Sequence, residues 1–109
     1  MAGLRRVESM ARLMAERFQE DLPIADIARA AGLHPNYAMP LFKRYCGVTV
    51  HSYLLQYRLT HAQRLLLTTD DKIIDVALAS GFGSESAFYS AFSKMVRDTP
   101  QAFRKRMDA

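Results

Sequence analysis

Apolar residues recur every three or four positions along most of the chain, which is the spacing of amphipathic helices. The first such pattern runs from Leu4 to about Glu20, with charged residues between the apolar ones. Proline or glycine interrupts the pattern where helices begin or end. Only residues 48–50 favour a strand, and they are too few to form one. The sequence therefore predicts an all-α protein with seven helices, over residues 4–20, 24–31, 35–46, 50–67, 73–80, 84–96 and 100–107.

The apolar stripe of each helix predicts which side chains face inward. A glycine at position 47 can end the third helix in a left-handed cap. In the first four helices the expected inward residues are Leu4, Val7, Ala11, Met14, Phe18, Ile24, Ile27, Ala28, Ala31, Ala38, Leu41, Phe42, Tyr45, Tyr53, Leu54, Tyr57, Ala62, Leu65 and Leu66.

Two stretches of the chain repeat one pattern. Before the glycine of each turn, Asp26, Ile27, Ala28 and Ala30 match Asp75, Val76, Ala77 and Ala79 at a spacing of 49 residues. After it, Ala38, Phe42, Thr49 and Tyr53 match Phe88, Phe92, Thr99 and Phe103 at a spacing of 50. Two copies are too few for a solenoid, so one small helical unit is used twice.

Each copy has the layout of a helix-turn-helix: a short helix with small residues, a tight turn with glycine, and a second helix with apolar anchors four apart. Ala28 and Ala77 lie where the two helices would cross closely. The second helix of such a motif packs one face on the first and offers the other to a DNA major groove. We expect one DNA-binding domain over 1–109, with subdomains at about 4–47 and 70–107 and a long central linker helix at about 50–67.

Net charge adds a hint about the partner. Fifteen Lys and Arg against eleven Asp and Glu give +4 and a pI near 9.5, which favours a polyanion. The basic residues cluster at 104–106 and at Lys43 and Arg44, although the solvated face of a slightly basic protein explains the same charge. The sequence shows no secretory signal and no membrane span, and Cys46 is a lone cysteine that cannot form an internal disulfide. These features favour a cytoplasmic protein, associated with the nucleoid when bound to DNA. Cys46 itself is expected to be a small packing residue.

Several short motifs carry a family resemblance. They are the segment RLTHAQRLL at 58–66, Asp75-Val76-Ala77, Gly81-Phe82, Phe88, Phe92, Thr99-Pro100 and Phe103-Arg104. With these residues the chain resembles the DNA-binding domain of the AraC/XylS transcriptional regulators, from about residue 4 to 104. The stretch NYAM at 36–39 is similar to the branch that controls sugar-utilisation operons. The resemblance implies a sequence-specific regulator of transcription, an activator, whose partner is double-stranded DNA.

The resemblance also implies site residues. It places Asn36, Tyr37, Met39 and Pro40 of the first recognition helix, and Glu85, Ser86, Tyr89 and Ser90 of the second, in base-facing positions. Phosphate contacts, which position a protein without reading sequence, fall to Lys43, Arg44, Lys94 and Arg97.

Side-chain chemistry supports several of these roles. Asn36 can bond bidentately to adenine, Glu85 can accept from the cytosine amino group, and Met39 or Ala87 can meet a thymine methyl. Good pairs of this kind discriminate by roughly 1 to 3 kcal/mol. Two alternatives remain open: Glu85 caps the N-terminus of its helix, and Tyr89 packs on the protein surface.

Helix length suggests how both units could read DNA together. A linker of some eighteen residues is roughly 27 Å long, and successive major grooves on one DNA face are about 34 Å apart. With the width of the units added, one monomer could read two half-sites of an asymmetric site in DNA that bends to reach both.

Two residues depart from the family pattern. Pro40 lies inside the first recognition helix, where proline removes a backbone hydrogen bond, so we expect a helix that is kinked or starts late and reads fewer bases. Arg97 stands where the family has glycine. Either the cap there has another geometry, or arginine tolerates a strained backbone to gain a phosphate contact.

Other functional classes have weaker support. No nucleophile, base or metal-ligand constellation is visible, and His34, His51 and His61 form no short ligand pair, so we expect no enzyme, no metal and no cofactor. A helical protein-interaction module is the alternative to DNA binding. It should lack the steep salt dependence of phosphate contacts.

Most members of the family carry an effector-binding, dimerising domain before such a DNA-binding domain. The chain is therefore expected to be an excised C-terminal piece, the other possibility being a natural one-domain regulator. As given, it should be monomeric and bind no small-molecule effector. The family also implies a secondary contact with RNA polymerase.

Overall fold

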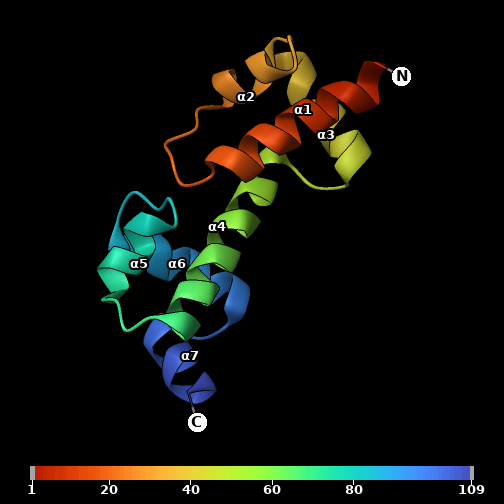
Figure 1. Cartoon of the computed structure of the whole chain (residues 1–109). Helices are drawn as coiled ribbons and strands as arrows, with labels where there is room; N and C mark the ends of the chain where they lie inside the picture. The colour runs from red at the N-terminus through yellow and green to blue at the C-terminus, as the bar shows by residue number, and fades with distance from the viewer. Residues whose placement is uncertain (1, 109) are drawn as a thin grey trace. The chain divides into compact units, whose positions relative to one another are not determined.

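A computed structural model describes residues 2–108, which form seven helices and no strand (Figure 1). The all-α prediction is therefore confirmed over this range. The helices are α1 (Ala2–Arg17), α2 (Ile24–Ala30), α3 (Pro35–Cys46), α4 (Val50–Thr68), α5 (Ile73–Ala79), α6 (Glu85–Val96) and α7 (Pro100–Met107). Even the 19-residue α4 lacks the apolar character that a membrane-crossing helix needs, as do the other helices of residues 2–108.

One helix end differs from the prediction, and one expectation about α3 is wrong. α1 ends at Arg17 rather than near Glu20, because the chain turns there with the Glu20 N–H donating to the Arg17 carbonyl at 3.0 Å. α3 begins at Pro35, so the expected late start is wrong. Proline suits the first position of a helix, where its missing N–H has no partner to lose.

The chain divides into two compact units within α4, between Tyr57 and Arg58. In unit 1, α1 packs on α2 and α3 through Val7, Met10 and Met14, which are all buried. Phe42 of α3 is fully buried, and its ring meets Tyr53 of α4 edge-on at 5.2 Å. The first part of α4 therefore closes this core.

Unit 2 has a core built largely from aromatic rings. Phe82, Phe88, Phe92 and Phe103 follow one another with ring centroids 5.1, 5.4 and 5.5 Å apart. Offset and edge-on contacts of this kind add stability beyond the burial of apolar area. The rings link the turn after α5 to α6 and to α7.

The sequence repeat extends over the whole of each unit. Val7, Met10 and Met14 of α1 correspond to Leu59, Ala62 and Leu66 of α4 at a spacing of 52 residues, and all six are buried. The second part of α4 therefore occupies in unit 2 the place that α1 has in unit 1. Each unit is a helix-turn-helix between a preceding and a closing helical segment.

Matching residues also end the matching helices. Gly47 and Arg97, 50 residues apart, both form left-handed C-caps, with φ of 78° and 61°. Each donates its N–H to a carbonyl four residues back, at 2.8 and 2.9 Å. Arg97 is the one non-glycine residue among 2–108 with positive φ. The alternative of another cap geometry is therefore wrong, and the strained arginine is present.

Three residues expected to face inward are exposed: Leu4 by 40%, Ile24 by 46% and Tyr45 by 49%. Leu4 and Ile24 lie in the first turn of their helices, where the remaining apolar positions, such as Ile27 and Ala28, already fill the contact. The ring of Tyr45 covers the start of α1 instead, since a Cβ added at Gly3 would lie 2.6 Å from its hydroxyl. Cys46 is also exposed rather than packed.

Candidate nucleic-acid interface

The first helix-turn-helix consists of α2, the turn 31–34 and α3. Three backbone bonds hold the turn: the N–H groups of Ala31 and Leu33 donate to the Ala28 carbonyl at 3.0 and 3.1 Å, and the Gly32 N–H donates to Arg29 at 2.9 Å. Gly32 has φ of 68°, which only glycine adopts readily. Ala28 is fully buried, and its small side chain permits the close crossing.

His34 caps the start of α3. Its Nδ1 accepts a hydrogen bond from the Asn36 N–H at 3.1 Å, which places the proton of a neutral ring on Nε2. With Pro35 at the first position, this cap fixes where α3 begins and so which residues it turns outward.

The outward face of α3 carries the predicted site residues of unit 1. Asn36, Pro40, Lys43 and Arg44 are exposed, and Tyr37 is 73% exposed. Met39 is half-buried against the core of the unit. Ala38 and Phe42 lie on the opposite face with no exposed surface.

The second helix-turn-helix consists of α5, a turn and α6. Phe82 N–H donates to Ala77 at 3.0 Å, the bond that Leu33 makes to Ala28 in the first copy. Ser84 is the N-cap of α6, its hydroxyl accepting from the Ala87 N–H at 3.0 Å. Ser84 and not Glu85 is therefore the N-cap residue. The exposed carboxylate of Glu85 lies in the first turn, where the helix dipole favours a negative charge.

Outward positions of α6 are mostly small and polar. Glu85, Ser86 and Ser90 are exposed. Tyr89 is half-buried, with its ring edge-on to Phe88 at 6.3 Å. Partial burial, and secondly the charge of Glu85, raise the pKa of the Tyr89 hydroxyl. Tyr89 thus has a packing contact as well as an accessible edge.

Four basic residues lie at the ends of the two second helices. Lys43 and Arg44 belong to the last turn of α3, Lys94 to the last turn of α6, and Arg97 is the cap that follows it. All four are exposed, and within residues 2–108 no carboxylate pairs with them. Their charges are therefore available to an anionic partner.

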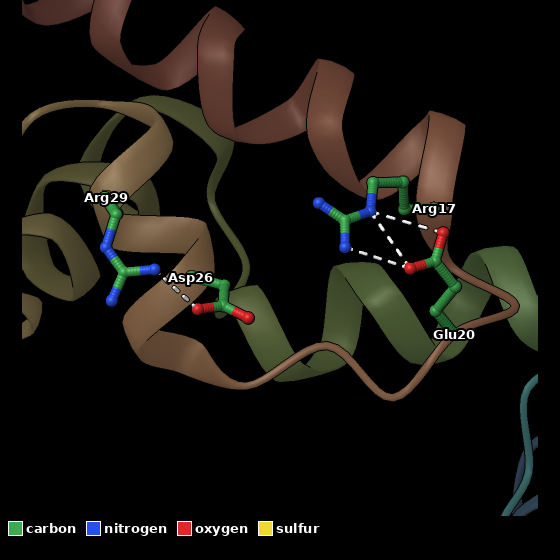
Figure 2. A network of polar contacts seen from close by, with 4 residues as sticks. All are labelled: Arg17, Glu20, Asp26 and Arg29. Atoms are coloured by element: carbon green, nitrogen blue, oxygen red, sulfur yellow. Dashed lines mark hydrogen bonds and ion pairs between the residues drawn. The ribbon is translucent and has the colours of Figure 1, made fainter.

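Other arginines are engaged within the protein. Arg17 donates to Glu20 through Nε and Nη2, at 2.9 to 3.2 Å, and Arg29 donates to Asp26 at 2.8 Å (Figure 2). This hydrogen bonding lowers the pKa of the Glu20 carboxyl. Both pairs are exposed, and in each of them the carboxylate neutralises the charge of the arginine.

The basic tail at 104–106 has a structural use that the sequence did not suggest. The guanidinium of Arg104 donates to the carbonyls of Leu66, Thr69 and Asp71, at 3.0, 3.1 and 2.8 Å. It thereby satisfies a carbonyl of the last turn of α4, at Leu66, and two carbonyls of the loop that follows the helix, at Thr69 and Asp71. Arg106 pairs with Asp98 at 3.0 Å. Two of the three charges in this cluster are therefore committed to the fold.

One side chain from the preceding helical segment braces each helix-turn-helix. In unit 1, Arg6 of α1 donates to the carbonyl of Ala31 at 2.7 Å. In unit 2, Nδ1 of His61 lies 3.1 Å from the hydroxyl of Ser80, which is fully buried and follows Ala31 by 49 residues. Burial, and secondly the charge of Arg64, lower the pKa of His61. Sequence spacing gave no signal for either contact.

The histidines have separate surroundings. His34 caps α3, His61 meets Ser80, and His51 is exposed. Among residues 2–108, no group of three or more His, Cys, Asp or Glu side chains could hold a metal ion.

Comparison with known proteins identifies the fold. Residues 27–106 match a helix-turn-helix domain family. The chain is 41% identical over 99 residues to the melibiose operon regulatory protein of Escherichia coli strain K12, which covers 91% of this chain and 33% of that protein. It is 35% identical over 108 residues to the transcriptional activator NphR of a Rhodococcus species, covering 95% and 32%. The chain thus spans about a third of the length of these relatives.

Solved structures give the same result. A transcriptional regulator from Chromobacterium violaceum, described as containing an AraC-type DNA-binding domain, has a TM-score of 0.85 and 31% identity, covering 95% of this chain and 93% of that one. The DNA-binding domain of AdpA, in complex with a target DNA, has a TM-score of 0.87 and 25% identity, covering 92% and 90%. With its duplicated helix-turn-helix and these matches, the chain belongs to the AraC-type family of helix-turn-helix domains.

Proposed function

We propose that the chain is a sequence-specific DNA-binding domain of a transcription regulator, and that each unit inserts its second helix, α3 or α6, into a major groove. The observation that carries the proposal is the pair of exposed faces with matching caps and unpaired basic residues at their C-terminal ends. The AdpA domain, which was solved with its target DNA, supports it.

Residue roles follow from the position of each side chain. We assign base contacts to Asn36, Tyr37, Met39 and Pro40 of α3 and to Glu85, Ser86, Tyr89 and Ser90 of α6. Lys43, Arg44, Lys94 and Arg97 contact phosphates. Asn36 suits adenine and Glu85 suits the cytosine amino group, because their side chains complement those base edges.

Reading of two successive grooves by one chain is part of the proposal. α4 is a continuous helix of 19 residues and is therefore roughly 28 Å long. That length is compatible with grooves about 34 Å apart once the width of the units is added. The DNA site would be asymmetric, because α3 and α6 present different side chains.

Further proposals concern the regulator in its biological setting. By likeness to the transcriptional activator NphR we propose activation, and by likeness to the melibiose operon regulatory protein we propose the branch that controls sugar-utilisation operons. We also propose that the protein is cytoplasmic and contacts RNA polymerase as a secondary role. This chain is proposed to be monomeric and to bind no effector.

Salt dependence of binding separates this function from the alternative, a helical module that binds protein. Four phosphate contacts predict that log K falls with log salt with a slope of about −3.6. Lys43→Gln and Lys94→Gln should each reduce the slope by about 0.9. Lys105→Gln, an exposed lysine outside the assigned interface, is the matched control. A slope near zero would favour the protein-interaction module.

A further inference from the structure

An apolar groove lies beside the recognition helix of unit 1. It has a volume of about 470 Å³, and most of its accessible lining is apolar. The lining residues are Ile24 of α2, Met39, Pro40 and Lys43 of α3, and Thr49, Val50 and His51 at the start of α4. Ile24 is 46% exposed and Pro40 is exposed, so the groove opens to solvent. Lys43 brings a positive charge to it.

We propose that this groove recognises thymine by its 5-methyl group, so that the half-site read by unit 1 is defined by thymines; the inference rests on the proposed DNA-binding function. In the major groove, the thymine methyl is the only apolar group that a base pair presents. A donor or acceptor of another base that lies against Ile24, Pro40 or Val50 would lose its hydrogen bonds to water, because none of these side chains carries a polar atom.

Continuity with the proposed interface identifies DNA as the occupant. Met39, Pro40 and Lys43 belong both to the groove and to the outward part of α3. Lys43 and the adjacent Arg44 have no carboxylate partner within residues 2–108, so their charge favours a polyanion over an apolar peptide at this surface.

Pro40 has no hydrogen-bond donor in its side chain and no backbone N–H, so its side chain can meet a base only through apolar contact. This explains a proline among polar positions of a recognition helix. The second copy differs at the corresponding residues, 50 positions later: Tyr89, Ser90 and Ser93 supply hydroxyl groups in place of Met39, Pro40 and Lys43. The effect of removing a methyl group should therefore be larger in the half-site of unit 1 than in that of unit 2.

Uracil scanning tests the proposal with the unmodified protein. Each thymine of a selected binding site is replaced in turn by uracil, which removes only the methyl group. The half-site of unit 1 is located by the positions whose base preference changes in Asn36→Ala. Within it, at least one uracil should weaken binding about fourfold, which corresponds to burial of one methyl group, whereas uracil in the half-site of unit 2 should change binding less than twofold.

Two surface variants identify the groove itself. Pro40→Ser introduces the residue of the matching position in unit 2 and returns a backbone donor to α3. Ile24→Ser changes the part of the lining that α2 supplies. Each should reduce the preference for thymine over uracil to less than twofold, with far-UV circular dichroism confirming that the helices are retained. Ser90→Ala, at the equivalent position in α6, is the matched control and should leave that preference unchanged.

The outcomes distinguish this inference from the function on which it rests. Sequence-specific binding that is indifferent to uracil throughout the half-site of unit 1 would overturn the inference and leave the function intact. A methyl effect that persists in both surface variants would also overturn it, because another part of the protein would then read the methyl. Absence of specific binding to any duplex would overturn the proposed function itself.

Discussion

The strained cap at Arg97 makes a prediction about the free energy of unfolding that can be tested by comparison with Gly47, the matching cap of α3. Arg97 has φ of 61° and ψ of 38°, a left-handed conformation that costs an L-residue roughly 1–2 kcal/mol relative to glycine. The greater freedom of glycine in the unfolded chain offsets roughly 0.5–1 kcal/mol of that difference. Arg97→Gly should therefore stabilise the protein by about 1 kcal/mol, which raises the melting temperature by roughly 4–8 °C.

Matched variants separate the backbone from the charge. Arg97→Gln keeps the Cβ and should leave stability close to that of the parent protein. Gly47→Arg creates the same strain in unit 1 and should destabilise by about 1 kcal/mol, because an added Cβ there meets no atom within 4 Å and only the backbone conformation counts. In DNA binding, both Arg97→Gly and Arg97→Gln should reduce the salt slope by about 0.9.

Thermal and urea unfolding followed by far-UV circular dichroism measure these changes. The reasoning about the cap is refuted if Arg97→Gly is no more stable than Arg97→Gln. An unchanged salt slope in Arg97→Gln would show instead that the strained residue does not contact phosphate, and the strain would then have no functional explanation.

Three other predictions concern single side chains. Arg104→Gln should lower the free energy of unfolding in urea by roughly 1–3 kcal/mol, because three carbonyls near the end of α4 lose their donor. The control Lys105→Gln should lower it by less than about 0.5 kcal/mol. Equal effects would contradict the role of Arg104. Pro40→Ala should stabilise by roughly 1–3 kcal/mol by restoring a backbone hydrogen bond, whereas Pro35→Ala at the first helical position should have little effect; no gain at Pro40 would show that α3 already accommodates proline. Because the pKa of His61 is lowered in the folded protein, the unfolded chain binds a proton at this residue at a higher pH than the folded protein does. The free energy of unfolding should therefore fall as the pH drops through the unfolded pKa of about 6.5. His61→Gln should reduce that fall, and an unchanged pH profile would refute the assignment.

Local sequence patterns predicted the helices because each has its own apolar stripe and is bounded by residues that favour helix ends. The repeat at 49 and 50 residues also predicted equivalent positions, and the structure extends it to the caps at Gly47 and Arg97. Helix faces were less certain at helix ends: Leu4 and Ile24 continue the apolar period yet lie in first turns that the core does not reach.

Long-range contacts between side chains and backbone could not be predicted from these patterns. Arg6 reaches a carbonyl 25 residues away, and Arg104 reaches carbonyls 33 to 38 residues away. In sequence, Arg104 looks like part of a basic tail, and position 54 in the first copy is leucine, so the repeat gives no warning of its role. The periodicity predicted the exposure of the candidate site residues except Met39 and Tyr89, which are half-buried. Whether a charge is free or paired required the structure.

Selection from random duplex DNA, repeated at two salt concentrations and followed by sequencing, tests the central claim most directly. Two exposed recognition helices with different side chains predict an asymmetric motif with two blocks of base preference about one helical turn apart, and enrichment that weakens at the higher salt concentration. A single block would contradict reading by both units, and absent or salt-insensitive enrichment would contradict DNA binding as the function of the domain.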